Sequence, residues 1–116
     1  MNIYGKDTMP IIHRSIIELI DLIFRKYEMF FGSEKNINNV YYYIYGYMAS
    51  KFDSKTAANI DKIFHYNFNE WLCNKYSDKI DHVMPWNKIY NKLFISENEK
   101  LDTFLLDFKI FINENS

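Results

Sequence analysis

The sequence predicts an all-α protein, a single compact bundle of about five helices formed by residues 1–116. Three observations favour this fold class. Glycine occurs three times and proline twice in 116 residues, and so few turn formers suit helices better than a meander of strands. Apolar residues recur at helical spacing along most of the chain. Residue patterns typical of helix starts precede several of these segments, and the length suits one domain.

A first helix is expected from Pro10 to about Arg25, because proline suits the first turn of a helix. Its main apolar face comprises Ile12, Ile16, Leu19, Ile20 and Ile23. Further apolar residues widen that face past half of the circumference, and Asp21 and Arg25 belong to a narrow polar stripe. We therefore expect this helix to be the spine of the bundle. The stretch 26–33 is expected to be a bend that ends at Gly32.

The segment from Ile37 to Phe52 is expected to be the second helix. Its stretch 41–47 is rich in tyrosine and could also form a strand, because aromatic residues favour strands. We prefer a helix because the apolar spacing continues through Met48 without a turn signal. The inward positions are expected to be Val40, Ile44, Tyr47 and Met48.

Three more helices are expected towards the C-terminus. Ser54 can cap a third helix that begins near Ala57, with a break near Asn67. Pro85 opens a short helix that ends near Leu93, and Ser96 and Glu99 form a capping box before the last helix. The inward faces of these helices comprise Ile60, Ile63, Phe64, Phe68, Trp71 and Leu72, then Trp86, Ile89, Tyr90 and Leu93, then Leu101, Phe104, Leu105, Phe108, Phe111 and Ile112.

Composition and charge exclude several classes of protein. The formal net charge is -1 and the pI is about 6.3, which argues against direct binding to a nucleic acid backbone. Cys73 is the single cysteine, so a reducing compartment is the simplest expectation. The N-terminus lacks the pattern of a signal peptide, and no apolar run is long enough for a membrane span. We expect a cytoplasmic protein that does not act at a membrane.

The residues that could carry chemistry are few. His65, Asn69 and Cys73 follow at steps of four, but such steps drift around a helix and no further residue completes a catalytic or metal-binding set. His13 falls in the apolar arc of the first helix, and His82 falls in a polar stretch. We therefore expect no enzyme activity, no catalytic residue, no metal and no cofactor.

The tyrosine cluster is the most informative feature of the sequence. Tyr43 and Tyr47 are expected in the core, whereas Tyr42 and Tyr45 fall on other sides of the helix, so that at least one should be exposed. Exposed rings can stack on nucleobases or anchor a protein interface. No Lys or Arg lies between Lys35 and Lys51, and the absence of a basic stretch favours a protein partner.

Several segments, in order, resemble small helical immunity proteins of bacterial contact-dependent inhibition and related polymorphic-toxin systems. Many members carry a pattern like R-P-x-M-Y-x-G, a helix with Gly-Tyr, an F-x-x-W-L segment, a short Trp-led helix and a final helix rich in Phe and Leu. Lys26 and Tyr27 stand where that pattern has Arg and Pro. The corresponding segments here are 26–32, 45–49, 68–72, 85–89 and 97–111.

The resemblance implies that this chain acts by binding, without chemistry of its own. An immunity protein of this kind binds the C-terminal domain of its cognate toxin, often a nuclease, in the cytosol and covers or distorts the active site. Nuclease toxins tend to be basic, and complementary acidic residues speed association and select the partner. The candidate partner-binding residues are the rings of Tyr42 and Tyr45 and the acids Glu70, Asp78, Asp81, Glu97 and Asp102.

Alternative functions stay open at this stage. A helical adaptor or a self-associating regulator would share the whole composition, and the location of its gene would distinguish it, since an immunity gene lies directly downstream of its toxin gene. An enzyme that uses His65 or His82 would need a pocket that unites a histidine with carboxylates. A nucleic-acid binder would show salt-sensitive affinity.

Overall fold

The computed structural model describes residues 15–115, which form α-helices and no strand. The stretch 41–47 lies inside a helix, as expected. The all-α prediction is confirmed, with one more helix than the expected five. The six helices of the described range are α1 (Ile16–Arg25), α2 (Tyr27–Phe31), α3 (Ile37–Asp53), α4 (Asn59–Lys75), α5 (Trp86–Leu93) and α6 (Glu97–Glu114).

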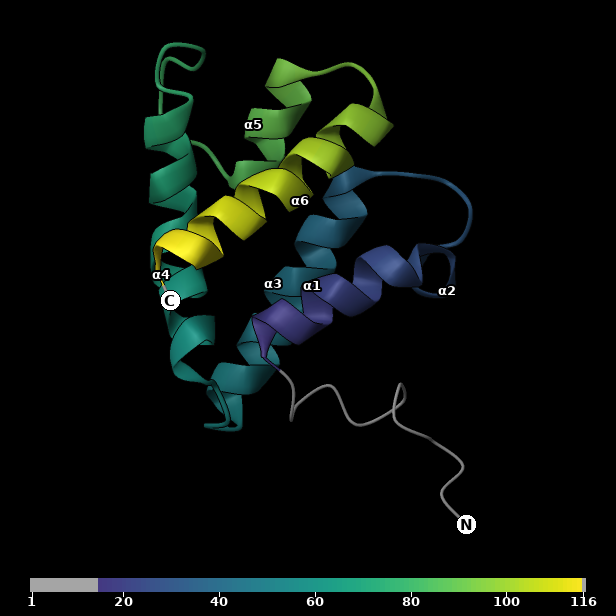
Figure 1. The fold of residues 1–116 in the computed structure, drawn as a ribbon, viewed down its shortest axis with the longest axis vertical. Helices are drawn as coiled ribbons and strands as arrows, with labels where there is room; N and C mark the ends of the chain where they lie inside the picture. Colours follow the sequence, from purple (N-terminus) through teal and green to yellow (C-terminus); the bar gives the residue numbers. More distant parts are fainter. Residues whose placement is uncertain (1–14, 116) are drawn as a thin grey trace.

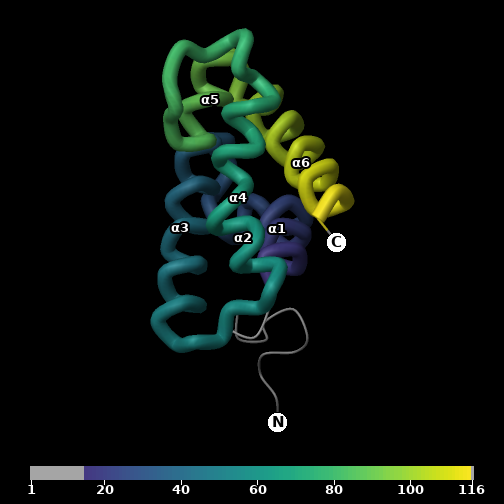
Figure 2. Tube along the Cα trace, turned by 90° about the vertical axis from the view of Figure 1, so that its left-hand side faces the viewer, coloured from purple at the N-terminus to yellow at the C-terminus, as the bar shows by residue number. Residues whose placement is uncertain are grey.

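The helices surround one core (Figure 1). α3 and α4 run in opposite directions, and α5 packs near the N-terminal end of α3 and the C-terminal end of α4. α1 and α6 lie on the near side in Figure 1. The quarter turn in Figure 2 places α3 on one side of α4 and α6 on the other. Within the described range, no helix combines the length and the apolar character needed to cross a membrane.

Aromatic rings form the centre of the core. The ring of Phe68 lies 6.0 Å from Trp86, 5.9 Å from Phe104 and 5.3 Å from Phe111, measured between centroids. Trp86 stacks on Phe104 at 4.4 Å. Full burial of one such side chain contributes roughly 1.5–3 kcal/mol, so this cluster ties α4, α5 and α6 together.

The structure corrects three sequence expectations about element boundaries. The expected bend at 26–33 contains the one-turn helix α2. This helix ends at Phe31 and is followed by its C-cap Gly32, where φ is +77°. α4 is continuous across Asn67, and it begins at Asn59 rather than near Ala57. α1 is described from its N-cap Ser15, whose side chain accepts a hydrogen bond from the Glu18 amide. The expected start at Pro10 and the position of His13 lie outside the described residues.

The expected cap at Ser54 is wrong, because Ser54 ends α3 and its hydroxyl donates to the Ser50 carbonyl, while α4 begins after Ala58. Two other local features follow the sequence pattern. Ser96 caps α6 by accepting a hydrogen bond from the Glu99 amide, which is the first half of the expected capping box. Asp21 and Arg25 form the expected ion pair on α1 at 3.0 Å. The local spacing of residues was sufficient for these features because each depends on neighbours within one helical turn.

Asp61 in α4 is a fully buried carboxylate that the sequence pattern did not single out. Its oxygens accept hydrogen bonds from the backbone amide of Ile16 at 2.6 Å and of Ala58 at 2.9 Å. Lys51 of α3 places its Nζ 3.8 Å from the same carboxylate. A single side chain therefore satisfies the starts of α1 and α4 and meets a buried cation of α3.

Asp107 in α6 is a second buried carboxylate. It accepts hydrogen bonds from Lys75 Nζ at 2.6 Å and from the hydroxyls of Tyr76 and Tyr90, each at 2.8 Å. Burial, with Asp107 as a further cause, raises the pKa of both Tyr76 and Tyr90 above the usual value for a phenol. The two phenols therefore remain neutral donors that link the α4 end and α5 to α6.

Candidate partner-binding surface

Three tyrosines of α3 form a contiguous aromatic surface. Tyr41 and Tyr45, one helical turn apart, stack with centroids 6.4 Å apart, and Tyr42 meets the Tyr41 ring edge-on at 5.3 Å. Tyr42 is 67% exposed and Tyr45 is 64% exposed. The expectation that at least one of these two rings is exposed is confirmed for both.

The remaining tyrosines of the cluster face inward. Tyr47 is buried, as expected. Tyr43 is half-buried, and its ring meets Phe30 of α2 edge-on at 5.2 Å. The expected core position of Tyr43 is therefore confirmed in part, and its ring helps to hold α2 against α3.

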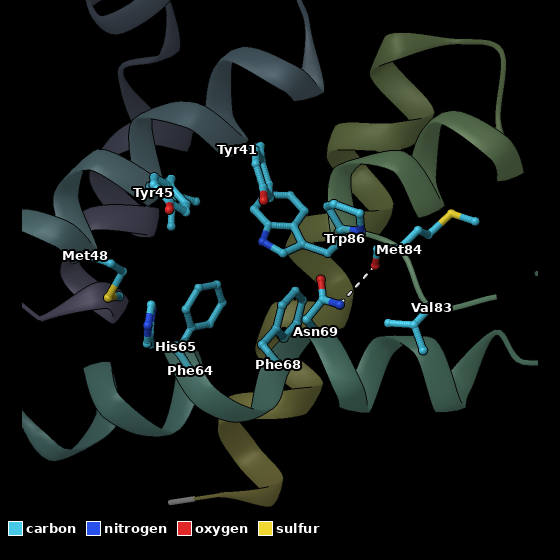
Figure 3. A pocket seen from close by; sticks show the side chains of 12 residues that line it. Tyr41, Tyr45, Met48, Phe64, His65, Phe68, Asn69, Val83, Met84 and Trp86 are labelled. Carbon is cyan, nitrogen blue, oxygen red and sulfur yellow. Dashed lines mark hydrogen bonds between the residues drawn. The ribbon is translucent and has the colours of Figure 1, made fainter.

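A pocket of about 380 Å³ opens between α3 and α4 beside the exposed tyrosines (Figure 3). One wall comes from α3, the other from α4, and the segment before α5 closes one end. The lining residues are Tyr41, Ile44, Tyr45, Met48, Phe64, His65, Phe68, Asn69, Val83, Met84, Pro85 and Trp86.

The end wall of the pocket is held in place by hydrogen bonds and by packing. Asn69 donates from Nδ2 to the Met84 carbonyl at 3.0 Å, and the thiol of Cys73 approaches the same carbonyl at 3.7 Å. Trp86 is fixed between the Phe104 ring and the edge of Tyr41, whose centroid is 5.0 Å away. These contacts preorganise the pocket, which reduces the entropy cost of binding.

The chemistry of the pocket is apolar with a polar rim. Most of its lining is apolar, its polar side chains are those of Tyr41, Tyr45, His65 and Asn69, and among the described residues no Lys, Arg, Asp or Glu lines it. Burial, followed by the neighbouring Tyr42 and Tyr45, raises the pKa of Tyr41, so its phenol stays neutral. A buried charge without a partner is costly. The pocket therefore suits an uncharged apolar or aromatic group that can also meet a hydroxyl, amide or imidazole at the rim.

The predicted acidic residues fall into two groups by their surroundings. Glu70 and Asp102 are exposed, and neither forms an ion pair or side-chain hydrogen bond within residues 15–115. Asp78 lies 3.9 Å from Lys79. Asp81 lies 2.6 Å from His82 Nδ1.

Asp81 also lies 3.7 Å from Lys92. The hydrogen bond to His82, then its own backbone amide and the Lys92 charge, lower the pKa of Asp81. The chain's own cations therefore offset part of the negative charge that Asp81 could present to a partner.

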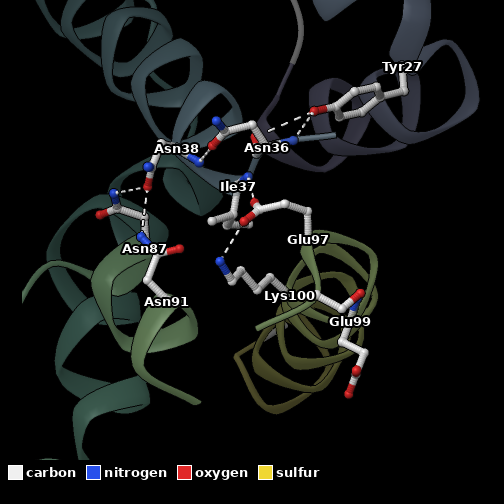
Figure 4. A network of polar contacts seen from close by, with 10 residues as sticks. Tyr27, Asn36, Ile37, Asn38, Asn87, Asn91, Glu97, Glu99 and Lys100 are labelled. Atoms are coloured by element: carbon white, nitrogen blue, oxygen red, sulfur yellow. Dashed lines mark hydrogen bonds and ion pairs between the residues drawn. The ribbon is translucent and has the colours of Figure 1, made fainter. Parts of the chain in front are cut away.

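The carboxylate of Glu97 links two helices through contacts with two other residues (Figure 4). Its Oε1 accepts a hydrogen bond from the Ile37 amide at 2.9 Å, and its Oε2 forms an ion pair with Lys100. Burial alone raises the pKa of Glu97, but the hydrogen bonds from Lys100 and the Ile37 amide outweigh it and leave the pKa below its usual value. This carboxylate joins the start of α6 to the start of α3.

The structure brings only part of the predicted site together. Tyr45 lines the pocket and Tyr42 contacts the ring of Tyr41, another lining residue. Glu70 follows Asn69 on α4, but a helix turns by about 100° per residue, so Glu70 points to another side of α4 than Asn69 does. Asp102 is exposed on α6, which lies on the other side of α4 from α3 (Figure 2). The tyrosines therefore form one surface, whereas Glu70 lies outside the pocket lining on α4 and Asp102 lies on α6.

Among the described residues, His65, His82 and Cys73 each have separate neighbours. His65 packs against Phe52 with ring centroids 4.7 Å apart, and Cys73 is buried behind Asn69. His82 is paired with Asp81 at the surface. In the part of the chain that the structure describes, no group of three or more His, Cys, Asp or Glu side chains could hold a metal ion.

The pocket itself was missed by the sequence reasoning. Met48, Phe64 and Phe68 were expected to point inward, and they do. Their arrangement around an open pocket depends on how far α3 and α4 diverge, and hydrophobic spacing along one helix carries no information about that distance. The one usable signal was an aromatic helix that carries no charge over residues 37–50 and has more rings than its buried face can accommodate.

These features define a helical domain with exposed tyrosine rings beside an apolar pocket. No family model, curated protein or solved structure matches the chain. The function therefore has to be argued from the surface and from the segments described in the sequence analysis.

Proposed function

We propose that this chain is an immunity protein that binds the C-terminal domain of a cognate toxin, expected to be a nuclease, and neutralises it by covering its active site. The observation that carries the proposal is the preformed pocket beside Tyr42 and Tyr45. It supports recognition of a folded partner by shape and aromatic contact. The resemblance to small helical immunity proteins supports the choice of partner.

The tyrosine surface has the physical properties of a protein interface. Tyrosine offers a large contact area at a low cost in side-chain entropy, and tyrosine and tryptophan are enriched among the residues that dominate binding energy. Tyr42 and Tyr45 present their rings to solvent next to a pocket that can accept an apolar side chain. A partner residue in the pocket, with the two rings around it, would form a desolvated centre.

The acidic residues are expected to raise the rate of association with the partner more than the affinity for it. Glu70 is exposed on α4 and forms no ion pair or side-chain hydrogen bond within residues 15–115, so it can meet a basic group. Exposed ion pairs add only about 0.2–1 kcal/mol each, but they accelerate encounter with a basic domain and help to exclude other partners. Asp78 and Asp81 lie on the segment that leads from α4 to the pocket wall and can extend this effect.

The first experiment is a pulldown from the native host with the full chain as bait, followed by a co-expression assay. Recovery of the C-terminal domain of a large secreted protein, and rescue of cells that express this domain, is the expected result. Recovery of only the bait, or a bound protein whose expression is harmless, would contradict the immunity proposal and favour a helical adaptor.

The tyrosine surface is then tested with the recovered domain by calorimetric titration. Tyr42→Ala combined with Tyr45→Ala is expected to weaken binding by about 2 kcal/mol or more, roughly thirtyfold, because both rings leave the interface centre. Met29→Ala is the matched control, since Met29 is 63% exposed on α2, away from the pocket. Equal affinity of the double variant and the control would place the interface elsewhere.

A further inference from the structure

A second apolar groove, of about 360 Å³, lies between α1 and α6. Both helices are on the near side of the molecule in Figure 1, whereas the tyrosine helix α3 lies on the opposite side in Figure 2. The groove is therefore separate from the surface proposed to bind the toxin domain. Its α1 wall comprises Ile17, Ile20 and Asp21, and its α6 wall comprises Leu105, Phe108, Lys109, Ile112 and Asn113.

The apolar surface continues beyond the groove. Ile17 on the α1 wall is 40% exposed. Leu106 is 59% exposed and precedes Lys109 by three residues on α6, so it lies beside the groove wall. Specific interfaces bury at least about 1,000 Å² in total, and Leu106 adds apolar surface to that of the groove lining.

The charges at this groove have opposite signs on opposite walls. Asp21 stands on the α1 wall, where it pairs only with Arg25 of its own helix at 3.0 Å within the described residues. Lys109 stands on the α6 wall and is exposed, and it forms no ion pair within residues 15–115. A partner surface of a single sign would be attracted by one wall and repelled by the other.

We propose that the occupant of this groove is a second copy of the chain, related by a two-fold axis that passes through the groove. An axis that lies in the interface and runs along the groove brings the same patch of both copies together and places each α1 wall against the α6 wall of the partner subunit. Asp21 then faces Lys109 of the partner subunit, and the contact occurs twice. The apolar residues of α1 cover those of α6 between the two ion pairs.

The test is a charge exchange, measured on the full chain by sedimentation over a hundredfold range of protein concentration. The wild-type chain is expected to show a concentration-dependent dimer. Asp21→Lys and Lys109→Glu are each expected to weaken dimerisation by about tenfold or more, since each reversal creates two like-charge contacts. The double variant is expected to restore the dimer with the charges exchanged.

Lys62→Glu is the matched control, because Lys62 is exposed on α4 and outside the groove. It should leave the dimer unchanged, and circular dichroism establishes that each variant is folded. A wild-type chain that stays monomeric overturns the proposal, and so does a dimer that withstands both single reversals. A double variant that stays monomeric while both single variants are folded also overturns it. None of these results depends on whether a toxin domain is ever recovered.

Discussion

At the scale of single residues, the surroundings of a carboxylate decide whether it serves the fold or faces a partner. Glu70 and Glu97 are the same residue type, yet their surroundings differ. Glu70 is exposed on α4, whereas Glu97 accepts a hydrogen bond from the Ile37 amide and forms an ion pair with Lys100. The sequence placed both among the candidate partner residues. Affinity measured after substitution of Glu97 would mix a loss of binding with a loss of fold stability.

The first prediction concerns the pH dependence that Glu97 confers. Its pKa in the folded chain lies below the ordinary value of 4.5. The ionised group therefore stabilises the fold fully above about pH 4.5, and this contribution is lost as the pH falls through the lowered pKa. Glu97→Gln should reduce the free energy of unfolding by about 1 kcal/mol at pH 7, since a charge-assisted contact is lost. The difference from wild type should shrink below pH 4.5.

Urea unfolding at several pH values measures this difference. Glu99→Gln is the control, because Glu99 lies in the same first turn of α6 and is exposed. It reports the effect of any charge near the helix start. If Glu97→Gln and Glu99→Gln gave the same pH profile, the contacts of Glu97 with the Ile37 amide and with Lys100 would not be the cause.

At the scale of helices, the starts of α1 and α4 are coupled through one side chain. Helix starts leave backbone amides without partners, and a local Ser, Thr, Asp or Asn normally supplies the acceptor. Ser15 does so for the Glu18 amide, but the Ile16 amide is satisfied by Asp61, 45 residues away in sequence. The order of α1 therefore depends on α4, and the two helices are expected to lose structure together.

The second prediction follows from this coupling. Asp61→Ala removes the acceptor of two helix-start amides and the negative charge next to Lys51 Nζ. We expect the free energy of unfolding to fall by about 3 kcal/mol, because loss of one partner from a buried ionic contact is strongly destabilising. Urea unfolding followed by circular dichroism measures it.

Two comparisons sharpen this measurement. Glu70→Ala, an exposed carboxylate of the same helix, should change stability by less than about 0.5 kcal/mol. If Asp61→Ala does not fold, Asp61→Asn keeps one oxygen acceptor and should give a folded chain of reduced stability. A loss for Asp61→Ala no larger than that for Glu70→Ala would mean that the buried carboxylate is dispensable.

At the scale of the whole molecule, the two grooves lie on different sides of the fold. The tyrosine pocket lies between α3 and α4, and the groove with Asp21 and Lys109 lies between α1 and α6. Each arises where two helices diverge and leave apolar side chains partly uncovered. A dimer formed through the second groove would leave both tyrosine surfaces free, so a complex of two chains with two partners is sterically possible.

The third prediction tests the independence of the two surfaces. Asp21→Lys, which is expected to weaken the dimer, should change the affinity for the recovered toxin domain by less than about twofold, since distant sites without shared contacts act additively. Conversely, the Tyr42→Ala and Tyr45→Ala double variant should dimerise like wild type. Titration calorimetry and sedimentation of both variants measure this. A large loss of toxin affinity in folded Asp21→Lys would show that the surfaces are coupled.

The sequence by itself determined the helical fold class, most inward-facing positions and the exposure of at least one of Tyr42 and Tyr45. Each of these depends on residue spacing within a few turns, because a helix of 3.6 residues per turn sorts its own side chains by face. The break expected near Asn67 was wrong, since packing of the α4 face on the core maintains the helix across that position.

Only the tertiary structure decided which surfaces those faces build. The buried roles of Asp61 and Asp107, the use of Glu97 as a link between α3 and α6, and the pocket beside the tyrosines all join residues that are distant in sequence. Such contacts depend on the distances and angles between helices. Those are determined by the packing of all side chains together, to which each helix contributes only one part.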